Sequence, residues 1–460
     1  MDFKKTGIPQ YSINDPFRKF QESLENVTTI GFGAIRGNLV LDGNNYLIGV
    51  DQNEITGEVE CVEVASLFHG DTFEGIDLTN MSAESFAQEL AKIGSTPIVE
   101  IDNVWWPKER MNRLTIAIPT FRRPQDLKRA VRGVLEQAGE LVGGSRVEAW
   151  EPEGDAAGAA DGDGGTGRGV SDVEVLVIDN DAQSTGREAA LAAAADAGVP
   201  VLSSAEAPEE PEAVGLRYVV EEKPGVAAVR NRALDETGGR DLLVFIDDDE
   251  EPEPGWLAAL VGLWASTGCQ AVAGPVIPVY EVEPEAWVRQ GEFFVRRTWP
   301  TGTVRPVAAS NCLLLDLGFV RRAGLRFDEA FGATGGEDTL FTRRLSAAGG
   351  VIRWCDEARV RDHVPASRLT RPWILRRQRS HAATSVRVEL ALAGGGAQPA
   401  IRAKAAAGGL VRIVVGGLRT AGGTLISSPQ HAAKGARLLA RGRGILAASV
   451  GGGVHREYDH

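Results

Sequence analysis

The stretch Leu242-Leu-Val-Phe-Ile-Asp-Asp-Asp249 is an apolar run that ends abruptly in three carboxylates, Asp247, Asp248 and Asp249, here called the acid triplet. A continuous apolar run is typical of a buried strand in a parallel sheet, and open α/β sheets bind ligands at the carboxyl ends of such strands. Adjacent carboxylates repel one another, and oxygen ligands favour a hard divalent ion, Mg2+ or Mn2+. The run therefore predicts a metal-diphosphate site. An acidic turn that only caps the next helix is the alternative.

Apolar strands and amphipathic helices alternate along the chain from Arg113 onward. This βαβ pattern predicts an α/β fold with a mostly parallel sheet and helices on both faces. Two stretches rich in Gly, Ala and acids, near 151–169 and 203–215, interrupt the pattern, and their composition predicts disordered surface insertions. The expected strands cover 114–118, 173–178, 216–220 and 242–246, and the expected helices cover 125–137, 187–197 and 226–236.

The first 110 residues differ in composition from the rest of the chain. They hold eight of the twelve asparagines and five of the nine lysines, but only three of the forty arginines. Short β-rich runs and helices expected at 16–24 and 83–93 predict a small α+β module over 1–110. A natural gene fusion and a laboratory fusion partner both explain the shift, and this segment resembles no family that we recognise.

Composition also excludes several classes of protein. With a net charge of −14, the chain lacks the basic surface that general nucleic-acid binding requires, so we expect no nucleic-acid partner. Four cysteines are scattered without zinc-ligand spacing, which favours a reduced, intracellular setting. We find no signal pattern and no apolar stretch long enough to span a bilayer. The expected location is the cytoplasm, and a peripheral position at the inner face of the membrane is compatible with it.

The C-terminal part, residues 393–460, is rich in Gly and Ala, and no acidic residue occurs between Leu390 and Arg456. Basic residues punctuate apolar clusters such as 410–418 and 438–446. A basic amphipathic segment of this kind is typical of helices that lie on an anionic membrane surface. Helices packed against the rest of the protein, or a partly disordered tail, explain the pattern equally well.

Polar and charged side chains follow several of the expected strands. The first strand breaks at Pro119 and places Thr120 and Arg122 at its edge. The second strand ends at Asp179, and the helix after the third strand carries Arg230. Because the carboxyl ends of parallel strands share one edge, we expect these residues beside the acid triplet, where they provide the acid and the cations that a nucleotide needs. Alternatively, Asp179 caps a helix and Arg230 pairs with a surface acid.

A second acidic motif, Gly335-Gly336-Glu337-Asp338, opens a helix that is expected to run through Leu345. Acids at a helix N-terminus are stabilised by the helix dipole, so capping alone explains Glu337 and Asp338. The double glycine favours a second interpretation, because it permits close approach of a ligand to the backbone. A carboxylate at that position is placed to take a proton from an attacking hydroxyl.

Six motifs occur in this order along the chain: IPTFRRP, VIDNDA, Arg230-Asn231, FIDDDEEP, GPV and GGEDTLF. Together they resemble the family-2 inverting glycosyltransferases of the GT-A fold, and in particular bacterial exopolysaccharide enzymes of the succinoglycan glucosyltransferase type. The resemblance runs from about Leu114 to Arg379 and implies a GT-A nucleotide-diphospho-sugar transferase domain over 111–392, preceded by the small α+β domain. It also implies a nucleotide-sugar donor, most often a UDP-sugar, and Mn2+ or Mg2+ as cofactor.

The resemblance implies roles for single residues. Asp247 and Asp248 would contact the uridine or ribose and the outer shell of the metal, and Asp249 would ligate the metal. His363 falls where some relatives place a histidine that contacts the diphosphate or the metal. The nearby Arg368, Arg371 and Trp373 are candidates for a loop that closes over the diphosphate. The residues that would line the nucleotide-sugar are Pro119, Thr120, Arg122, Asp179 and Arg230.

The mechanism implied by the resemblance is a single displacement at the anomeric carbon. Asp338 would act as the general base that removes the acceptor proton, and Glu337 beside it would orient the acceptor. The acceptor oxygen attacks from the face opposite the leaving group, so the configuration inverts and no covalent sugar intermediate forms. A hydroxyl of a saccharide or of a lipid-linked glycan would be the acceptor.

Two other functions compete with this interpretation. A sugar nucleotidyltransferase shares the acidic metal site, but it is expected to carry a Gly-rich loop after the first strand, where this chain has Ile118-Pro119-Thr120-Phe121. A non-catalytic protein that binds a nucleotide or a glycan is the other alternative. The presence of both Asp249 and Asp338 favours the enzyme.

Overall fold

The structure is a computed structural model of the whole chain. It divides into two compact units, Met1–Lys108 and Glu109–His460, and each is considered by itself. The described residues are 112–143, 169–203 and 214–452, together with the backbone of the strands between Glu25 and Asp77. The helices expected at 16–24 and 83–93, and most of the two expected insertions, lie outside these residues.

The first unit contains a four-stranded sheet in the order β1-β2-β3-β4, in which every neighbouring pair is antiparallel. A two-stranded sheet of β5 and β6 follows it. The β-rich runs of the sequence thus correspond to strands of one meander. The strands are β1 (Glu25–Thr29), β2 (Ala34–Leu41), β3 (Asn44–Gln52), β4 (Val59–Ser66), β5 (Thr72–Phe73) and β6 (Ile76–Asp77).

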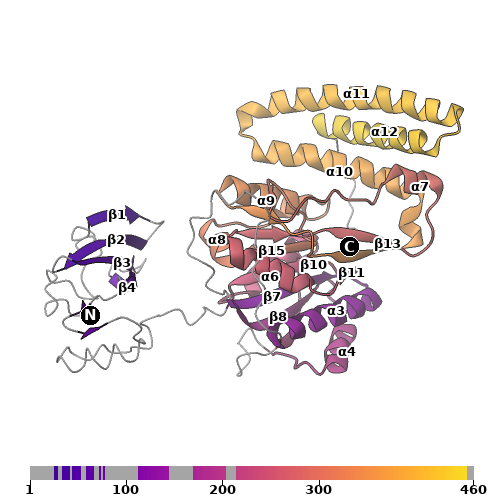
Figure 1. Cartoon of the computed structure of the whole chain (residues 1–460). Coiled ribbons are helices and arrows are strands. Elements are labelled where there is room, and N and C mark those ends of the chain that lie inside the picture. The colour runs from indigo at the N-terminus through magenta and orange to yellow at the C-terminus, as the bar shows by residue number, and fades with distance from the viewer. Residues whose placement is uncertain are drawn as a thin grey trace. The chain divides into compact units, whose positions relative to one another are not determined.

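An eight-stranded sheet forms the centre of the second unit, in the order β14-β16-β12-β15-β10-β7-β8-β9 (Figure 1). The four strands at one end, β10, β7, β8 and β9, are parallel, and β15 joins β10 in antiparallel fashion. The bounds are β7 (Asn112–Thr120), β8 (Val170–Asp179), β9 (Val214–Val220), β10 (Leu242–Ile246), β12 (Ala271–Ala273), β14 (Val304–Arg305), β15 (Cys312–Asp316) and β16 (Ile352–Trp354).

Helices cover both faces of this sheet, as the alternating pattern predicted. Side chains alternate along β10, so that Leu242, Val244 and Ile246 join the core beneath α3, α4 and α6, whereas Leu243 and Phe245 join the core beneath α5, α8 and α9. The bounds are α3 (Pro124–Gly143), α4 (Arg187–Ala197), α5 (Val226–Glu236), α6 (Trp256–Thr267), α7 (Ala286–Gly291), α8 (Leu317–Arg322) and α9 (Glu337–Ala347).

A small sheet and three long helices complete the unit. The small sheet has the order β11-β17-β13, and it starts directly after the acid triplet. The C-terminal helices are stacked so that α12 contacts both α10 and α11, and α11 lies outermost (Figure 1). The bounds are β11 (Glu250–Pro252), β13 (Val276–Tyr280), β17 (Val360–Val364), α10 (Arg371–Leu392), α11 (Gln398–Leu425) and α12 (Pro429–Ser449).

Glycines allow α11 and α12 to pack closely. Gly409, Gly416 and Gly423 recur at every seventh position of α11, and all three are buried. A Cβ at Gly409 would lie 3.0 Å from the carbonyl oxygen of Gly442, and one at Gly416 would lie 2.9 Å from that of Gly435. Only residues without a side chain fit these contacts, so the hairpin depends on them. None of the described helices is both long and apolar enough to cross a membrane.

Candidate active site

The carboxyl ends of β7, β8 and β10 meet at one edge of the sheet, as the sequence predicted. Thr120, the last residue of β7, donates a hydrogen bond of 2.7 Å from Oγ1 to Oδ2 of Asp248. Asp248 is buried, and its burial raises its pKa to about 7, although the charge of Arg123 opposes that shift. Thr120 and the triplet therefore form one connected edge.

Two arginines hold the third acid of the triplet. Nη1 of Arg123 lies 3.0 Å from Oδ2 of Asp249 and 3.2 Å from Oδ1 of Asp248, and Nη1 of Arg368 lies 3.1 Å from the same Asp249 oxygen. The carboxylates therefore already have cationic partners. Arg368 was expected near the diphosphate, but Arg123 was not singled out from the sequence.

The neighbouring Arg122 points elsewhere. It adopts a positive φ of 54°, and its guanidinium contacts Asp181 at 3.4 Å rather than the triplet. This hydrogen bond lowers the pKa of Asp181. The turn after β7 therefore directs the two consecutive arginines to different acids, and the second of them, Arg123, reaches the triplet. Pro119 lies at the end of β7, paired in register with Ile178 of β8.

Asp179 has protein donors on both carboxylate oxygens. Its Oδ1 accepts a hydrogen bond from the backbone N–H of Asp181 at 2.9 Å, and its Oδ2 accepts one from Gly186 at 2.8 Å and one from the hydroxyl of Tyr218 at 2.6 Å. The residue is fully buried. In this state Asp179 fixes the loop that leads into α4 by accepting the N–H of Gly186, but no side chain caps the helix, so the capping role considered for Asp179 is not what the structure contains.

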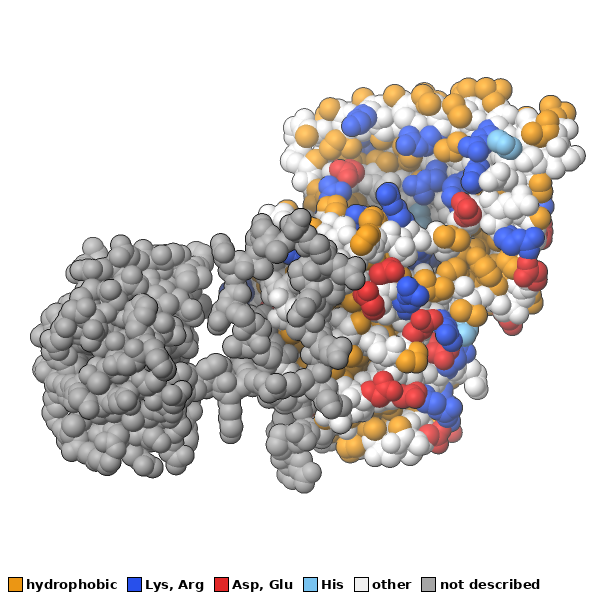
Figure 2. Space-filling model, viewed as in Figure 1, with side chains coloured by type: hydrophobic (Ala, Val, Ile, Leu, Met, Phe, Trp, Pro, Cys, Tyr) orange, Lys and Arg blue, Asp and Glu red, His pale blue; other side chains and the backbone are white. Residues whose placement is uncertain are grey.

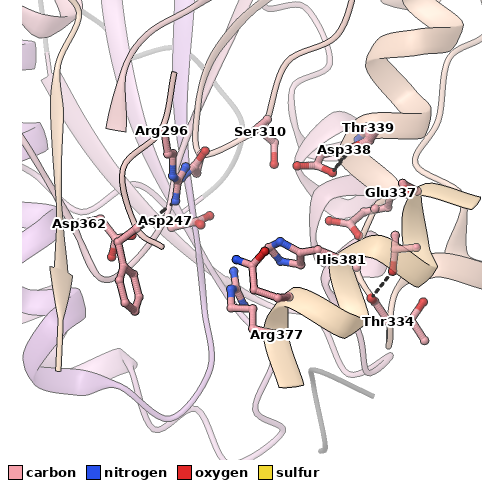
Figure 3. Close-up of a pocket in the computed structure, with 18 of the residues that line it drawn as sticks. Asp247, Arg296, Ser310, Thr334, Glu337, Asp338, Thr339, Asp362, Arg377 and His381 are labelled. Atoms are coloured by element: carbon pink, nitrogen blue, oxygen red, sulfur yellow. Dashed lines mark hydrogen bonds and ion pairs between the residues drawn. The ribbon is translucent and has the colours of Figure 1, made fainter. Parts of the chain in front are cut away.

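A cavity of about 500 Å³ opens between Asp247, the first acid of the triplet, and α10. Asp247 and Asp362 lie on one side of it, and Glu337 and Asp338 lie on the other at the start of α9 (Figure 3). Side chains from α10 project into the space between these two walls (Figure 3). The cavity thus has one acidic wall at the strand edge and a second at a helix N-terminus.

Arg230 connects these two acidic walls. It makes a buried ion pair with Glu337, and its Nη2 lies 3.6 Å from Oδ1 of Asp247. Burial raises the pKa of Glu337 to about 7, and the charge of Arg230 opposes that shift. The Glu337 side chain lines the cavity but is only 3% exposed, and its Oε1 is engaged with Arg230. The surface pairing considered for Arg230 is therefore not what the structure contains.

Asp338 is the more accessible acid of the second wall. Its Oδ1 accepts the backbone N–H of Thr339 at 2.5 Å, which keeps the side chain at the first turn of α9. The two preceding glycines have φ values of 74° and 94°. A Cβ at Gly336 would overlap Cγ2 of Thr384 in α10. The double glycine therefore accommodates a close approach of α10, where the sequence had suggested a ligand.

Replacing Gly336 with alanine is expected to lower the free energy of unfolding by roughly 3 kcal/mol, because a strained φ adds to a steric overlap. Gly349 is a matched control, since its φ is 92° and a Cβ added there would meet no atom within 4 Å. Gly349→Ala should cost only about 1–2 kcal/mol. Thr384→Ser removes the overlapping methyl and should recover part of the Gly336→Ala loss. Equal losses for both glycines in urea denaturation would contradict this explanation.

The predicted metal ligand His363 is not brought to the side chains of the triplet. Its Nε2 lies 2.9 Å from Oε2 of Glu251, and its contact with Asp249 is a backbone hydrogen bond of 3.3 Å. Because side chains alternate between the two faces of a strand, the neighbouring Asp362 faces the cavity instead. Within the part of the chain that the structure describes, no three His, Cys, Asp or Glu side chains are arranged to hold a metal.

The carboxylates of this edge nevertheless suit a cation. Burial raises the pKa of Asp247, and the charges of Asp249 and Asp362 raise it further against the opposing charge of Arg230. Burial and the charge of Asp249 also raise the pKa of Asp362. Closely placed acids with oxygen donors fit Mg2+ or Mn2+ in charge and donor type. In this state arginines supply the compensating charge.

The remaining wall of the cavity consists of aromatic and cationic residues, of which only Trp373 was named from the sequence, as part of a loop over the diphosphate. The rings of Phe294 and Trp373 are stacked, with centroids 6.1 Å apart and an interplanar angle of 12°. Arg377 lies over the Trp373 ring at 5.4 Å. Burial, with the charges of Arg377 and two further arginines, lowers the pKa of His381 to about 3, so its imidazole is neutral at physiological pH. No motif predicted this wall, because it belongs to α10 and to the loop after α7.

Residues 168–315 match the family described as Glycosyl transferase family 2. The matched residues include the parallel strands β8, β9 and β10 and the acid triplet, so this part of the second unit is similar to a family-2 glycosyl transferase domain.

The chain is 33% identical over 212 residues to a succinoglycan biosynthesis protein, ExoM, of Rhizobium meliloti (strain 1021). The matched region covers 45% of this chain and 62% of that protein, so the chain spans about three fifths of the relative's length.

Two solved structures are also similar to this chain. GalNAc-T7, solved with UDP, GalNAc and Mn2+, is similar with a TM-score of 0.38 and 13% identity over 60% of this chain and 51% of its own. Residues 1–349 of TarS from S. aureus are similar with a TM-score of 0.37 and 10% identity over 70% of this chain and 90% of theirs.

Proposed function

We propose that the protein is an inverting glycosyltransferase. It moves a sugar from a nucleotide-sugar, a UDP-sugar, to a hydroxyl of a saccharide or lipid-linked glycan acceptor. The main observation behind this proposal is that Asp247 and Asp338 face each other across one cavity of about 500 Å³. That volume lies within the range of small-molecule sites, about 300–1,000 Å³. The site therefore offers a place for a donor diphosphate at one wall and a base at the other.

The chemical step follows from these positions. Asp338 accepts the proton of the acceptor hydroxyl while that oxygen forms a bond to the anomeric carbon. The bond between the anomeric carbon and the diphosphate oxygen breaks, and its electron pair leaves with the nucleoside diphosphate. Attack from the opposite face inverts the configuration, and no carboxylate nucleophile is needed. Arg230 holds Glu337 beside the base and so keeps the start of α9 in place.

The acidic edge is the proposed metal site. Asp249 and Asp247 would hold Mn2+ or Mg2+, which when bound neutralises negative charge on the diphosphate. Arg123 and Arg368 now occupy the Asp249 carboxylate, so binding of the donor and its cation requires these guanidinium groups to turn toward the phosphate oxygens. Arginine suits either partner, because its planar fork pairs with carboxylates and phosphates alike. His363 has no part in this proposal, since its imidazole contacts Glu251.

The acceptor is assigned to the aromatic wall. The stacked rings of Phe294 and Trp373 present flat apolar surfaces beside polar groups, a combination that suits a sugar ring. The neutral imidazole of His381 both donates and accepts hydrogen bonds, as hydroxyl groups require. We assign the reaction to the cytoplasm, which agrees with the three buried free cysteines of the described residues, Cys269, Cys312 and Cys355.

A panel of nucleotide-sugars tests the proposal. The protein is incubated with Mn2+ or Mg2+ and each donor, and release of the nucleoside diphosphate is measured with and without a saccharide acceptor. Release that depends on the acceptor is expected with at least one UDP-sugar, and a chelator should slow it by at least about a hundred-fold. Nucleotide binding without release from any donor would instead identify a non-catalytic binding protein. Release of pyrophosphate from a nucleoside triphosphate would identify a nucleotidyltransferase.

A further inference from the structure

The outermost C-terminal helix, α11, exposes an unusual amount of apolar surface. Val411 is 61% exposed, Leu418 71% and Leu425 85%, although their helix is buried along its glycine face. Seven of the thirteen large exposed apolar side chains among the described residues belong to α11 or to the residue after it. They are Leu410, Val411, Val414, Val415, Leu418, Leu425 and Ile426, here called the α11 strip.

The strip forms one continuous face. Its members recur mostly at spacings of one, three and four residues, which places them on the side of α11 opposite the glycines that contact α12. Figure 2 shows hydrophobic side chains along this outer edge, with Lys and Arg side chains beside them. Isolated apolar residues are common on protein surfaces, but a contiguous apolar face marks a contact with another apolar phase.

The charges around the strip are of one sign. The whole chain carries −14, yet no acidic residue occurs from Leu390 to Arg456. Lys404, Arg412 and Arg419 lie on α11 itself, and in the part of the chain that is described none of them forms an ion pair with a carboxylate. Arg412 instead donates to the carbonyl oxygen of Gly408 in its own helix, at 3.0 Å. These cations are available to an external anion.

We propose that the α11 strip is a docking surface for an anionic lipid bilayer. An apolar face flanked by Lys and Arg is the pattern of helices that lie in the plane of the lipid interface. A second copy of this chain is a weaker match, because two strips with the same positive charge would repel each other. The surface is independent of the transfer chemistry, since none of its residues lines the cavity.

Cosedimentation with vesicles tests the docking surface in the full chain. The protein should bind vesicles of phosphatidylglycerol and phosphatidylcholine in equal parts, bind vesicles of phosphatidylcholine alone much less, and release from the former as salt is added. Val411→Asp with Leu418→Asp should lower the affinity by at least about ten-fold. Arg412→Gln with Arg419→Gln should lower the affinity for the anionic vesicles by about five-fold for each cation removed, and should leave binding to phosphatidylcholine vesicles unchanged.

Matched controls separate docking from a general effect of charge. Val201→Asp with Val304→Asp adds the same charges at two valines that are 53% and 58% exposed and lie outside the C-terminal helices, and binding should be unchanged. Wild-type binding that is equal on the two vesicle types, or absent from both, would overturn the proposal, as would full binding by Val411→Asp with Leu418→Asp. A concentration-dependent dimer in the absence of lipid that these two substitutions abolish would show that a second copy is the occupant.

Discussion

Replacing Asp338 with asparagine is expected to lower kcat by about a thousand-fold, because the amide cannot accept the proton of the acceptor hydroxyl. The substitution keeps the size of the side chain and the oxygen that accepts the Thr339 N–H at 2.5 Å. The start of α9 should therefore stay in place, and the affinity for the nucleoside diphosphate should be unchanged. The measurement is acceptor-dependent release of the nucleoside diphosphate, together with titration of UDP binding.

Asp316→Asn provides the control for this variant. Asp316 caps α8 with a hydrogen bond of 2.9 Å from the N–H of Phe319, so it too is an acid at a helix N-terminus, but it does not line the cavity. Its kcat should stay within about two-fold of wild type, since it touches no part of the reacting groups. If Asp338→Asn retained more than about a tenth of wild-type kcat, Asp338 would not be the base, whereas loss of UDP binding would point to misfolding of the site.

Replacing Arg230 with methionine is expected to lower the free energy of unfolding by about 1–3 kcal/mol at neutral pH, because it leaves the buried Glu337 carboxyl without its hydrogen-bond partner. Removing both charges, as Arg230→Met with Glu337→Gln, should recover much of the loss. Arg240→Met is not a suitable control, since it breaks a different buried pair, but Arg326→Met breaks the exposed pair with Asp235 and should cost less than about 1 kcal/mol.

The same pair predicts an unusual dependence of stability on pH. The pKa of Glu337 is raised by burial to about 7, above the ordinary glutamate value of 4.5, so the folded protein binds this proton more tightly than the unfolded chain does. Its contribution to stability is therefore fully present below about pH 4.5 and decreases as the pH rises toward 7. Urea denaturation from pH 4.5 to 7 should show a smaller decrease for Glu337→Gln. An identical profile for both proteins would contradict the shifted pKa.

Hydrophobic periodicity predicted the sheet and its helices well, because they repeat a local pattern. The helices expected at 187–197 and 226–236 and the strand expected at 242–246 have the same bounds in the structure. The strand expected at 114–118 extends to Asn112–Thr120, since pairing with β8 continues beyond the apolar residues. Strand ends such as this depend on neighbours that a local pattern does not contain.

Prediction of the site was more uneven. The parallel order of the strands was enough to bring Thr120 to Asp248, because it fixes which strand ends are neighbours. The order of the strands did not show whether Arg122 or Arg123 reaches the triplet. The positive φ of Arg122 in the turn after β7 directs Arg122 away and leaves Arg123 beside Asp249. The register of β17 likewise decides which side chain faces the cavity. His363 was expected there, but the neighbouring Asp362 lines the cavity and His363 contacts Glu251.

Most of the α10 wall was not predicted from the sequence, for a different reason. Trp373 was expected only as part of a loop over the diphosphate, and Arg377 and His381 line the cavity because α10 packs on the glycines before α9. That contact joins segments far apart along the chain, and no periodic pattern in α10 marks the side that faces the cavity. Its role becomes visible only when the two segments are placed together in space.

The stacking of α10, α12 and α11 sets the distance between the exposed face of α11 and the cavity beside α10. Packed helices lie about 8–10 Å apart between axes, so the two steps from α11 through α12 to α10 amount to roughly 20 Å. If the protein docks through α11 as proposed, its cavity would lie at about that distance above the lipid headgroups. A hydroxyl borne directly on a lipid anchor would fall short of Asp338, whereas the end of a partly built glycan would reach it. The three helices would thus fix the distance between the membrane and the cavity, and only acceptors long enough to span it would react.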